Sequence, residues 1–163
     1  MRPNKRRKKR IFFRNLLLYL WQLPQHLAAL IVWLVLDLSH KESSVHGKDV
    51  LGERVILVTV KGLGVSLGNY IFLDTPINMT LMHERGHSKQ SVMFGPLYLL
   101  IIGIPSGVFN NLWDRVFHKR WSLEKRYRWY YGRYPEKQAD RLGGVQRNLL
   151  SEQDVKRRRG RFG

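Results

Sequence analysis

The stretch Met82-His83-Glu84-Arg85-Gly86-His87-Ser88-Lys89-Gln90 decides what fold and chemistry this sequence predicts. It contains the pattern His-Glu-x-x-His. Residues four apart lie on the same face of a helix, so His83 and His87 can direct two imidazoles at one point. Glu84 follows His83 directly and can reach a water molecule held at that point. Two histidines with an adjacent base are typical of a zinc hydrolase.

The residues around this stretch predict that it is helical. Thr75 is a suitable N-cap and Pro76 a suitable first helical residue, and apolar residues follow at Ile77 and Leu81. Gly86 lies between the two histidines, where it costs about 1 kcal/mol of helix stability relative to alanine. A glycine there is useful if another backbone or a substrate must approach the helix closely.

A second short motif, Pro135 to Gly144, provides the residues that a zinc site still needs. Pro135 can begin a short helix and Gly143 can end it, which places Glu136 and Asp140 on one face. Catalytic zinc takes three protein ligands, and its histidines usually have a carboxylate behind them. We therefore expect Glu136 to be the third ligand and Asp140 to orient a histidine. The alternatives are His118 as third ligand, or an ordinary helix start with acids near its positive end.

The two motifs together resemble the gluzincin class of zinc metallopeptidases. The chain is also similar to a set of small bacterial membrane-associated proteins that share a His-Glu-x-Gly-His-x-x-Gln-Ser core. The similar blocks are residues 65–73, 83–91, 95–99, 103–106 and 136–145. This resemblance implies Zn²⁺ bound by His83, His87 and Glu136, with Glu84 as the general base. Arg85 stands where an aromatic residue is usual.

Composition limits the kind of partner. The chain has 163 residues, which suits one domain with tails, and its net charge is +17. Such a charge favours an anionic partner, namely phospholipid head groups, nucleic acid or an acidic protein. The chain has no cysteine, so a metal site must use histidine and carboxylate ligands.

The N-terminal part predicts a membrane anchor. Residues 1–10 form a basic tail, and residues 11–38 are mostly apolar with no small-residue cleavage site after them. Polar residues interrupt the segment, and Pro24 should kink it. It is therefore either one kinked span or two helices lying in the bilayer interface, with a buried core helix as the soluble alternative. The basic residues at both ends of the chain predict cytoplasmic termini at the cell membrane, on the cytoplasmic leaflet.

The middle of the chain predicts an α+β domain, residues 39–150, like that of zinc peptidases. Ser39 to Gly52 is polar and predicts a loop; it holds His46, and a lone loop histidine is rarely a ligand. Residues 54–61, 65–67 and 69–73 predict a small antiparallel sheet before the metal helix, with Gly68 at a bulge or bend. An exposed strand edge beside that helix can align a peptide substrate.

The apolar segment 92–113 separates the two motifs, so a complete membrane crossing there would place Glu136 on the wrong side. Its glycines and prolines favour a re-entrant or interfacial hairpin. Residues 114–134 are rich in aromatic and basic residues, which suits a membrane interface or a nucleic acid. Tyr130, Tyr131 and His118 are unranked candidates for stabilising an oxyanion. A helix to Gln153 and a basic tail, 151–163, are expected to end the chain.

The sequence thus predicts a membrane-associated zinc peptidase that acts on a peptide or protein. Glu84 would take a proton from the attacking water and later deliver it to the leaving amine. The alternative is a basic, membrane-tethered protein that binds nucleic acid or acidic lipid without catalysis. A third option is a membrane protein in which zinc is only structural. Nucleic acid is possible but not favoured as the partner.

Overall fold

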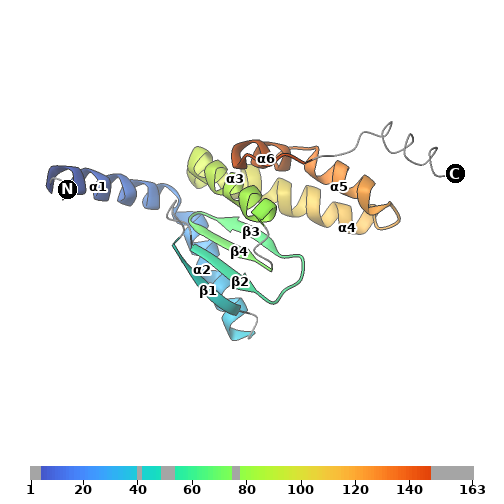
Figure 1. The fold of residues 1–163 in the computed structure, drawn as a ribbon, viewed down its shortest axis with the longest axis horizontal. Helices are drawn as coiled ribbons and strands as arrows, with labels where there is room; N and C mark the ends of the chain where they lie inside the picture. Colours follow the sequence, from blue (N-terminus) through green and yellow to red (C-terminus); the bar gives the residue numbers. More distant parts are fainter. Residues whose placement is uncertain (1–4, 40–41, 49–53, 75–77, 148–163) are drawn as a thin grey trace.

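The computed structural model describes residues 5–39, 42–48, 54–74 and 78–147, and for residues 5–9 and 42–48 it describes the backbone alone. Helices predominate, and they pack against a small four-stranded sheet (Figure 1). This composition is compatible with the predicted α+β class.

The sheet is mixed, although the sequence predicted an antiparallel one. Its strands are β1 (Glu42–Lys48), β2 (Arg54–Val58), β3 (Gly64–Leu67) and β4 (Tyr70–Leu73), in the order β1-β2-β4-β3. The β1–β2 and β3–β4 pairs are antiparallel, but β2 and β4 are parallel. β4, with the fully buried Ile71, Phe72 and Leu73, takes a central position, and β3 takes an edge.

One further expectation about the sheet was wrong, because the predicted loop 39–52 contains strand β1. The bend expected at Gly68 is confirmed: this residue forms the tight turn between β3 and β4, with a φ of 61°. Only glycine adopts this left-handed conformation without strain.

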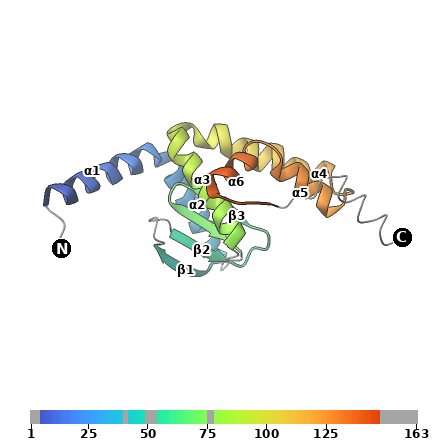
Figure 2. The ribbon, with the colours of Figure 1, turned by 45° about the horizontal axis from the view of Figure 1, so that its top comes forward.

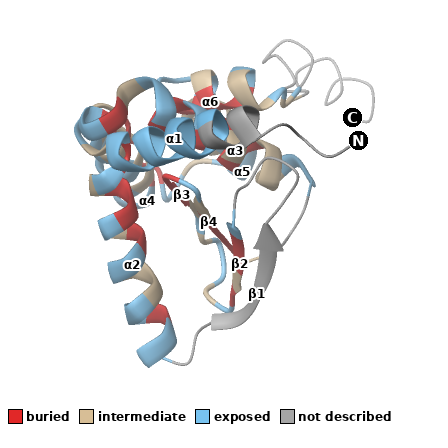
Figure 3. Ribbon diagram, turned by 90° about the vertical axis from the view of Figure 1, so that its left-hand side faces the viewer, coloured by how far each residue is buried: buried red, intermediate tan, exposed pale blue. Residues whose placement is uncertain are grey.

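The two faces of the sheet pack against different helices. Ile56 and Phe72 face one core cluster, which also contains Ala29 from α2 (Leu23–Leu38). Ile71 and other side chains of the opposite face form a second cluster with Leu81 of α3 (Asn78–Phe94). Figure 3 shows α2 alongside the sheet.

The N-terminal helices confirm the predicted kink. Helix α1 (Lys5–Trp21) begins inside the expected basic tail, since lysine and arginine are good helix formers. It ends at Trp21, and α2 follows after Gln22 with Pro24 in its first turn. Among the described residues no single helix is long and apolar enough to cross a bilayer. Residues 10–21 and α2 together reach that length and composition, but they are bent by 72°.

Within the second apolar segment the chain leaves the right-handed helical conformation at Gly95, whose φ is 51°, and then continues as one helical run. The hairpin expected at the membrane stays a prediction. Helix α3 (Asn78–Phe94) leads into a run of changing helix type, residues 95–117. This run comprises η1 (Gly95–Leu97), η2 (Leu99–Gly103), η3 (Pro105–Leu112) and α4 (Trp113–Phe117). Its π-helical turns accommodate Pro105 without a break. After α4 the chain turns, and α5 (Leu123–Tyr131) returns toward α3 and leads to α6 (Glu136–Gly143).

Residues at the start of this run contact the bend between α1 and α2. Trp21 donates a hydrogen bond from Nε1 to the carbonyl of Val92, at 2.9 Å. A Cβ at Gly95 would lie 2.0 Å from the Trp21 ring, so only glycine allows this approach. Tyr98 donates its hydroxyl to the carbonyl of Ser66, at 2.9 Å. The block 95–99, Gly-Pro-Leu-Tyr-Leu, therefore connects the bend between α1 and α2, the helical run and strand β3.

Candidate metal centre

Helices α3 and α6 are in backbone contact, and this contact brings the two sequence motifs together. A Cβ at Gly86 would lie 1.9 Å from the carbonyl oxygen of Ala139 on α6. A Cβ at Gly143 would lie 2.0 Å from the carbonyl oxygen of Met82 on α3. Glycine at both positions lets the helices approach closely enough for their functional side chains to meet. The backbone approach suggested by Gly86 is thus present.

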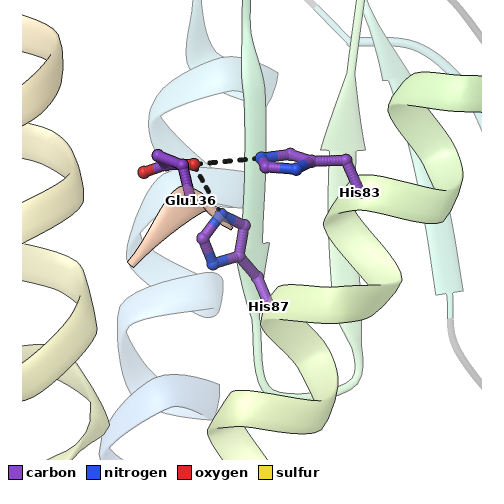
Figure 4. Close-up of side chains that lie close together, drawn as sticks. All are labelled: His83, His87 and Glu136. Atoms are coloured by element: carbon purple, nitrogen blue, oxygen red, sulfur yellow. Dashed lines mark hydrogen bonds and ion pairs between the residues drawn. The ribbon is translucent and has the colours of Figure 1, made fainter. Parts of the chain in front are cut away.

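His83, His87 and Glu136 form one buried group (Figure 4). The Nε2 atoms of His83 and His87 lie 3.0 and 3.1 Å from Oε2 of Glu136. One potential ligand atom from each residue lies within 4.8 Å of the others. Zinc bonds of about 2.1 Å place tetrahedral ligand atoms roughly 3.4 Å apart. The two distances to Glu136 are thus within about 0.4 Å of the spacing of zinc ligands, and all three ligand atoms lie close enough together to face one ion.

Both histidines are held from behind through Nδ1. His83 Nδ1 lies 2.7 Å from Oδ1 of Asp140, and His87 Nδ1 lies 2.7 Å from Oε1 of Gln90. The Gln90 amide nitrogen donates to the carbonyl of Pro135 and to Gln138. Its oxygen must therefore be the acceptor, and His87 must donate from Nδ1. Each Nε2 faces Glu136, so on losing its proton to a metal ion both lone pairs would face the same point, which is the usual arrangement of metal-binding histidines.

The charges of the group are coupled. Burial lowers the pKa of His83, but its bonds to Asp140 and Glu136 outweigh burial and raise that pKa to about 9. Burial alone would raise the pKa of Glu136, yet the two histidines bring it below its ordinary value. The pKa of Asp140 is likewise lowered, because bonds to His83 and Arg147 outweigh burial. The carboxylates are thus ionised at neutral pH.

Glu84 lies beside this group and between α3 and β3. A Cβ at Gly64 would come within 2.8 Å of its Oε1. Its Oε2 is buried and has no hydrogen-bond partner. Burial raises the pKa of Glu84, although His87 and His83 act in the opposite direction. A carboxylate in such surroundings is suited to accept a proton.

A cavity of about 570 Å³ opens onto His83 and Glu84. Its volume is in the range of small-molecule and peptide sites. Tyr130 and Tyr131, two of the three candidates for stabilising an oxyanion, line it. Burial raises the pKa of Tyr131 to about 12, so this hydroxyl stays protonated and able to donate.

Other sequence-predicted residues lie elsewhere. His118 does not join the metal-binding group: its Nδ1 faces Asp114 at 3.3 Å, and its ring stacks on Trp121. His46 lies in β1, where only the backbone is described. The predicted cap Thr75-Pro76 falls outside the described residues, as do the expected C-terminal helix beyond Arg147 and the tail 151–163.

Two supporting residues carried no predicted role. Gln90 lies three residues after His87 on the same helix, so helical spacing alone could have linked them. Arg147 pairs with Asp140 from outside the second motif, at 2.6 Å between Nε and Oδ2. Nothing in the sequence around Arg147 indicated this contact.

No protein-family model matches this chain, and no curated protein and no solved structure is significantly similar to it. The chemistry of the group itself must therefore indicate its ligand. Two imidazole nitrogens and one carboxylate oxygen are a donor set that suits zinc. The Glu136 oxygen Oε1 is buried without a hydrogen-bond partner, as expected of a carboxylate that has capacity for a cation. The residues present thus fit a metal ion.

Proposed function

We propose that this chain is a zinc-dependent peptidase of the kind that the His-Glu-x-x-His motif suggests. One observation carries the proposal: His83 and His87 turn their Nε2 atoms toward Glu136, while Asp140 and Gln90 hold the opposite nitrogens. Three protein ligands leave a fourth position open, which is typical of catalytic zinc and not of structural zinc.

Zinc bound there would polarise the peptide carbonyl and make water a nucleophile near neutral pH. Glu84 would take the proton of the attacking water and then deliver it to the leaving amine. Asp140 and Gln90 would keep the imidazoles in position during the reaction. Tyr130 and Tyr131 lie where a hydroxyl could donate to the oxygen of the carbonyl under attack.

Strand β3 is the best candidate to align the substrate. It is an edge strand of the sheet and packs beside α3. Gly62, Leu63 and Gly64, at and before its start, line the cavity with His83 and Glu84. An extended peptide could add to this edge through backbone hydrogen bonds, which would pass its chain across the metal group.

The decisive experiment compares wild type with Glu84→Gln. The variant keeps the size of the side chain but cannot accept the proton. We expect one zinc per chain in both proteins, measured by mass spectrometry. We also expect at least about a hundredfold loss of hydrolysis in the variant, assayed on quenched-fluorescent peptides with a randomised centre. His87→Ala should lose the zinc. Full hydrolysis by Glu84→Gln, or a zinc-free wild type under zinc-replete conditions, would exclude the mechanism.

The net charge of +17 and the exposed apolar helices favour a second candidate, a basic membrane-tethered protein that binds acidic lipid or nucleic acid. The histidine and carboxylate group would then be a buried ion-pair network. Binding to an oligonucleotide or to anionic vesicles would weaken steeply with salt and ignore chelators. If zinc is only structural, chelation would unfold the protein and Glu84→Gln would change nothing.

A further inference from the structure

Exposed apolar side chains are concentrated in two segments of the described chain. With four exceptions, every exposed large hydrophobic residue lies in residues 11–38 or 92–117. The exceptions are Met79, Leu123, Tyr127 and Tyr134. Figure 2 shows α1 and the run 95–117 along one side of the molecule, with β1 and β2 on the opposite side. These two elements therefore place apolar side chains on one side of the molecule, whereas α2, which also exposes apolar side chains, runs alongside the sheet (Figure 3).

The run 95–117 carries a continuous apolar stripe on its outer side. The stripe consists of Leu97, Leu100, Ile104, Val108, Leu112 and Val116, each at least 42% exposed. Steps of three or four residues keep these side chains on one side of a helix. Soluble proteins rarely expose so long a contiguous apolar surface unless it binds something.

The inner side of the same run faces the core and the metal-binding group. Ile102 is buried in the core, and Asn110 donates to the carbonyl of Tyr134 at 3.1 Å. Ser106 lies close enough to Glu136 to lower the pKa of that carboxyl. A helix is about 10 Å across, so roughly one helix diameter separates the stripe from the candidate metal ligands.

Charge indicates what covers the stripe. Arg115, Lys119 and Arg120 are exposed where the stripe ends, and Arg10 and Arg14 are exposed among the apolar residues of α1. Basic residues that flank an apolar face fit a bilayer with anionic head groups. Nucleic acid fits poorly, because the stripe itself offers no cation to a phosphate.

We propose that the stripe lies in the interface of an anionic bilayer and holds the cavity at the membrane surface. The same run supplies Asn111, Asp114 and Arg115 to the cavity wall, next to Leu112 and Val116 of the stripe. A peptide that enters there comes along the lipid surface. The assignment of a substrate class rests on the proposed peptidase function. A cavity at the membrane surface would take membrane-anchored proteins and cut them in a segment close to the head groups.

The first experiment tests whether the stripe lies on a membrane. The chain has no cysteine, so a single introduced thiol can be labelled specifically. Val108→Cys places a fluorophore on the stripe, and Arg141→Cys places one on the exposed side of α6. The vesicles contain phosphatidylcholine with about one quarter phosphatidylglycerol. With nitroxide-labelled lipid we expect quenching at Val108→Cys and none at Arg141→Cys. Equal quenching at both sites, or none at either, would overturn the docking.

A second measurement tests the stripe without a label. Wild type should float with these vesicles, and the double variant Leu100→Gln/Ile104→Gln should bind about tenfold more weakly or worse. Both positions are exposed, so the variant should keep its fold, which circular dichroism checks. Unchanged flotation of the double variant would contradict the proposal, whatever its zinc content.

A third experiment tests the substrate class with the randomised quenched-fluorescent peptides, each made with and without a palmitoyl chain. On vesicles we expect the anchored peptides to be cleaved about tenfold faster or more, because they share the surface with the enzyme. The Glu84→Gln variant sets the background. Equal rates would refute the substrate class while leaving the peptidase intact. No cleavage of either set by zinc-loaded, vesicle-bound protein would refute the peptidase and the substrate class, while the docking stands on its own measurements.

Discussion

Arg147 orients the carboxylate of Asp140, and Asp140 in turn orients His83. The Arg147 guanidinium donates to both oxygens of Asp140, from Nε at 2.6 Å and from Nη2 at 3.0 Å. It also lies over the ring of Tyr131, 3.4 Å from the centroid, and that ring packs against His83. A planar, bidentate contact fixes direction as well as charge. The orientation of His83 therefore depends on a residue that never touches the metal-binding group.

We predict that Arg147→Gln weakens zinc binding about ten- to a hundredfold, because Asp140 loses the partner that directs it. Arg147→Lys keeps the positive charge but loses the bidentate guanidinium contact. Its zinc affinity should therefore lie between those of wild type and Arg147→Gln. Competition with a chromophoric chelator measures the affinity. Arg141→Gln removes the same charge from an exposed site on α6 and is the control. Equal zinc affinity in Arg147→Gln and Arg141→Gln would show that Arg147 has no positioning role.

At the scale of elements, the contact between α3 and α6 builds the site. Each helix contributes a glycine at the point where it meets the other backbone. α3 carries His83 and His87, and α6 carries Glu136 and Asp140. A shift of either helix would separate ligands that now lie about 3 Å apart. The glycines thus set the distances between the candidate metal ligands through helix separation.

Gly86→Ala should destabilise the protein by about 3 kcal/mol, because the new methyl group meets the carbonyl of Ala139 and forces the helices apart. Zinc affinity should fall in parallel. Denaturant unfolding of detergent-solubilised protein measures the first effect. Gly107→Ala is the matched control, since a Cβ there meets nothing within 4 Å. If Gly86→Ala behaves like Gly107→Ala, the close approach of the two helices is not required.

At the scale of the whole molecule, a bound metal would connect distant parts of the chain. His87 and Glu136 are 49 residues apart, and the helical run 95–117 and α5 lie between them. A ligand that binds only the folded state stabilises it in proportion to its affinity. Zinc would therefore stabilise the fold as well as supply chemistry.

Zinc at a hundred times its Kd should add about 2.7 kcal/mol of stability. For a chain of this length, that corresponds to a rise in Tm of roughly 5–10 °C. Thermal unfolding with and without a chelator measures the shift. His87→Gln should show no zinc-dependent shift, whereas Glu124→Gln, at an exposed carboxylate on α5, should show the full one. A shift of equal size in His87→Gln would place the zinc elsewhere.

The candidate site was largely predictable because its parts are local in sequence. The spacing of His83 and His87 places both imidazoles on one helix face, and Glu136 and Asp140 share a face for the same reason. The kink near Pro24 follows from the missing amide hydrogen of proline. The meeting of the two motifs was inferred from what zinc requires, while the glycines that permit it reveal their partners only in three dimensions.

What the sequence by itself determined is therefore local: the paired histidines, the paired acids, the bend, and the separation of apolar from basic segments. Tertiary structure alone decided that β4 lies between β2 and β3, that residues 95–117 form one helical run, and that Arg147 returns to Asp140. Periodicity reports the conformation of neighbouring residues. Strand order, helix continuity and long-range pairing depend on which surfaces the folded chain buries together.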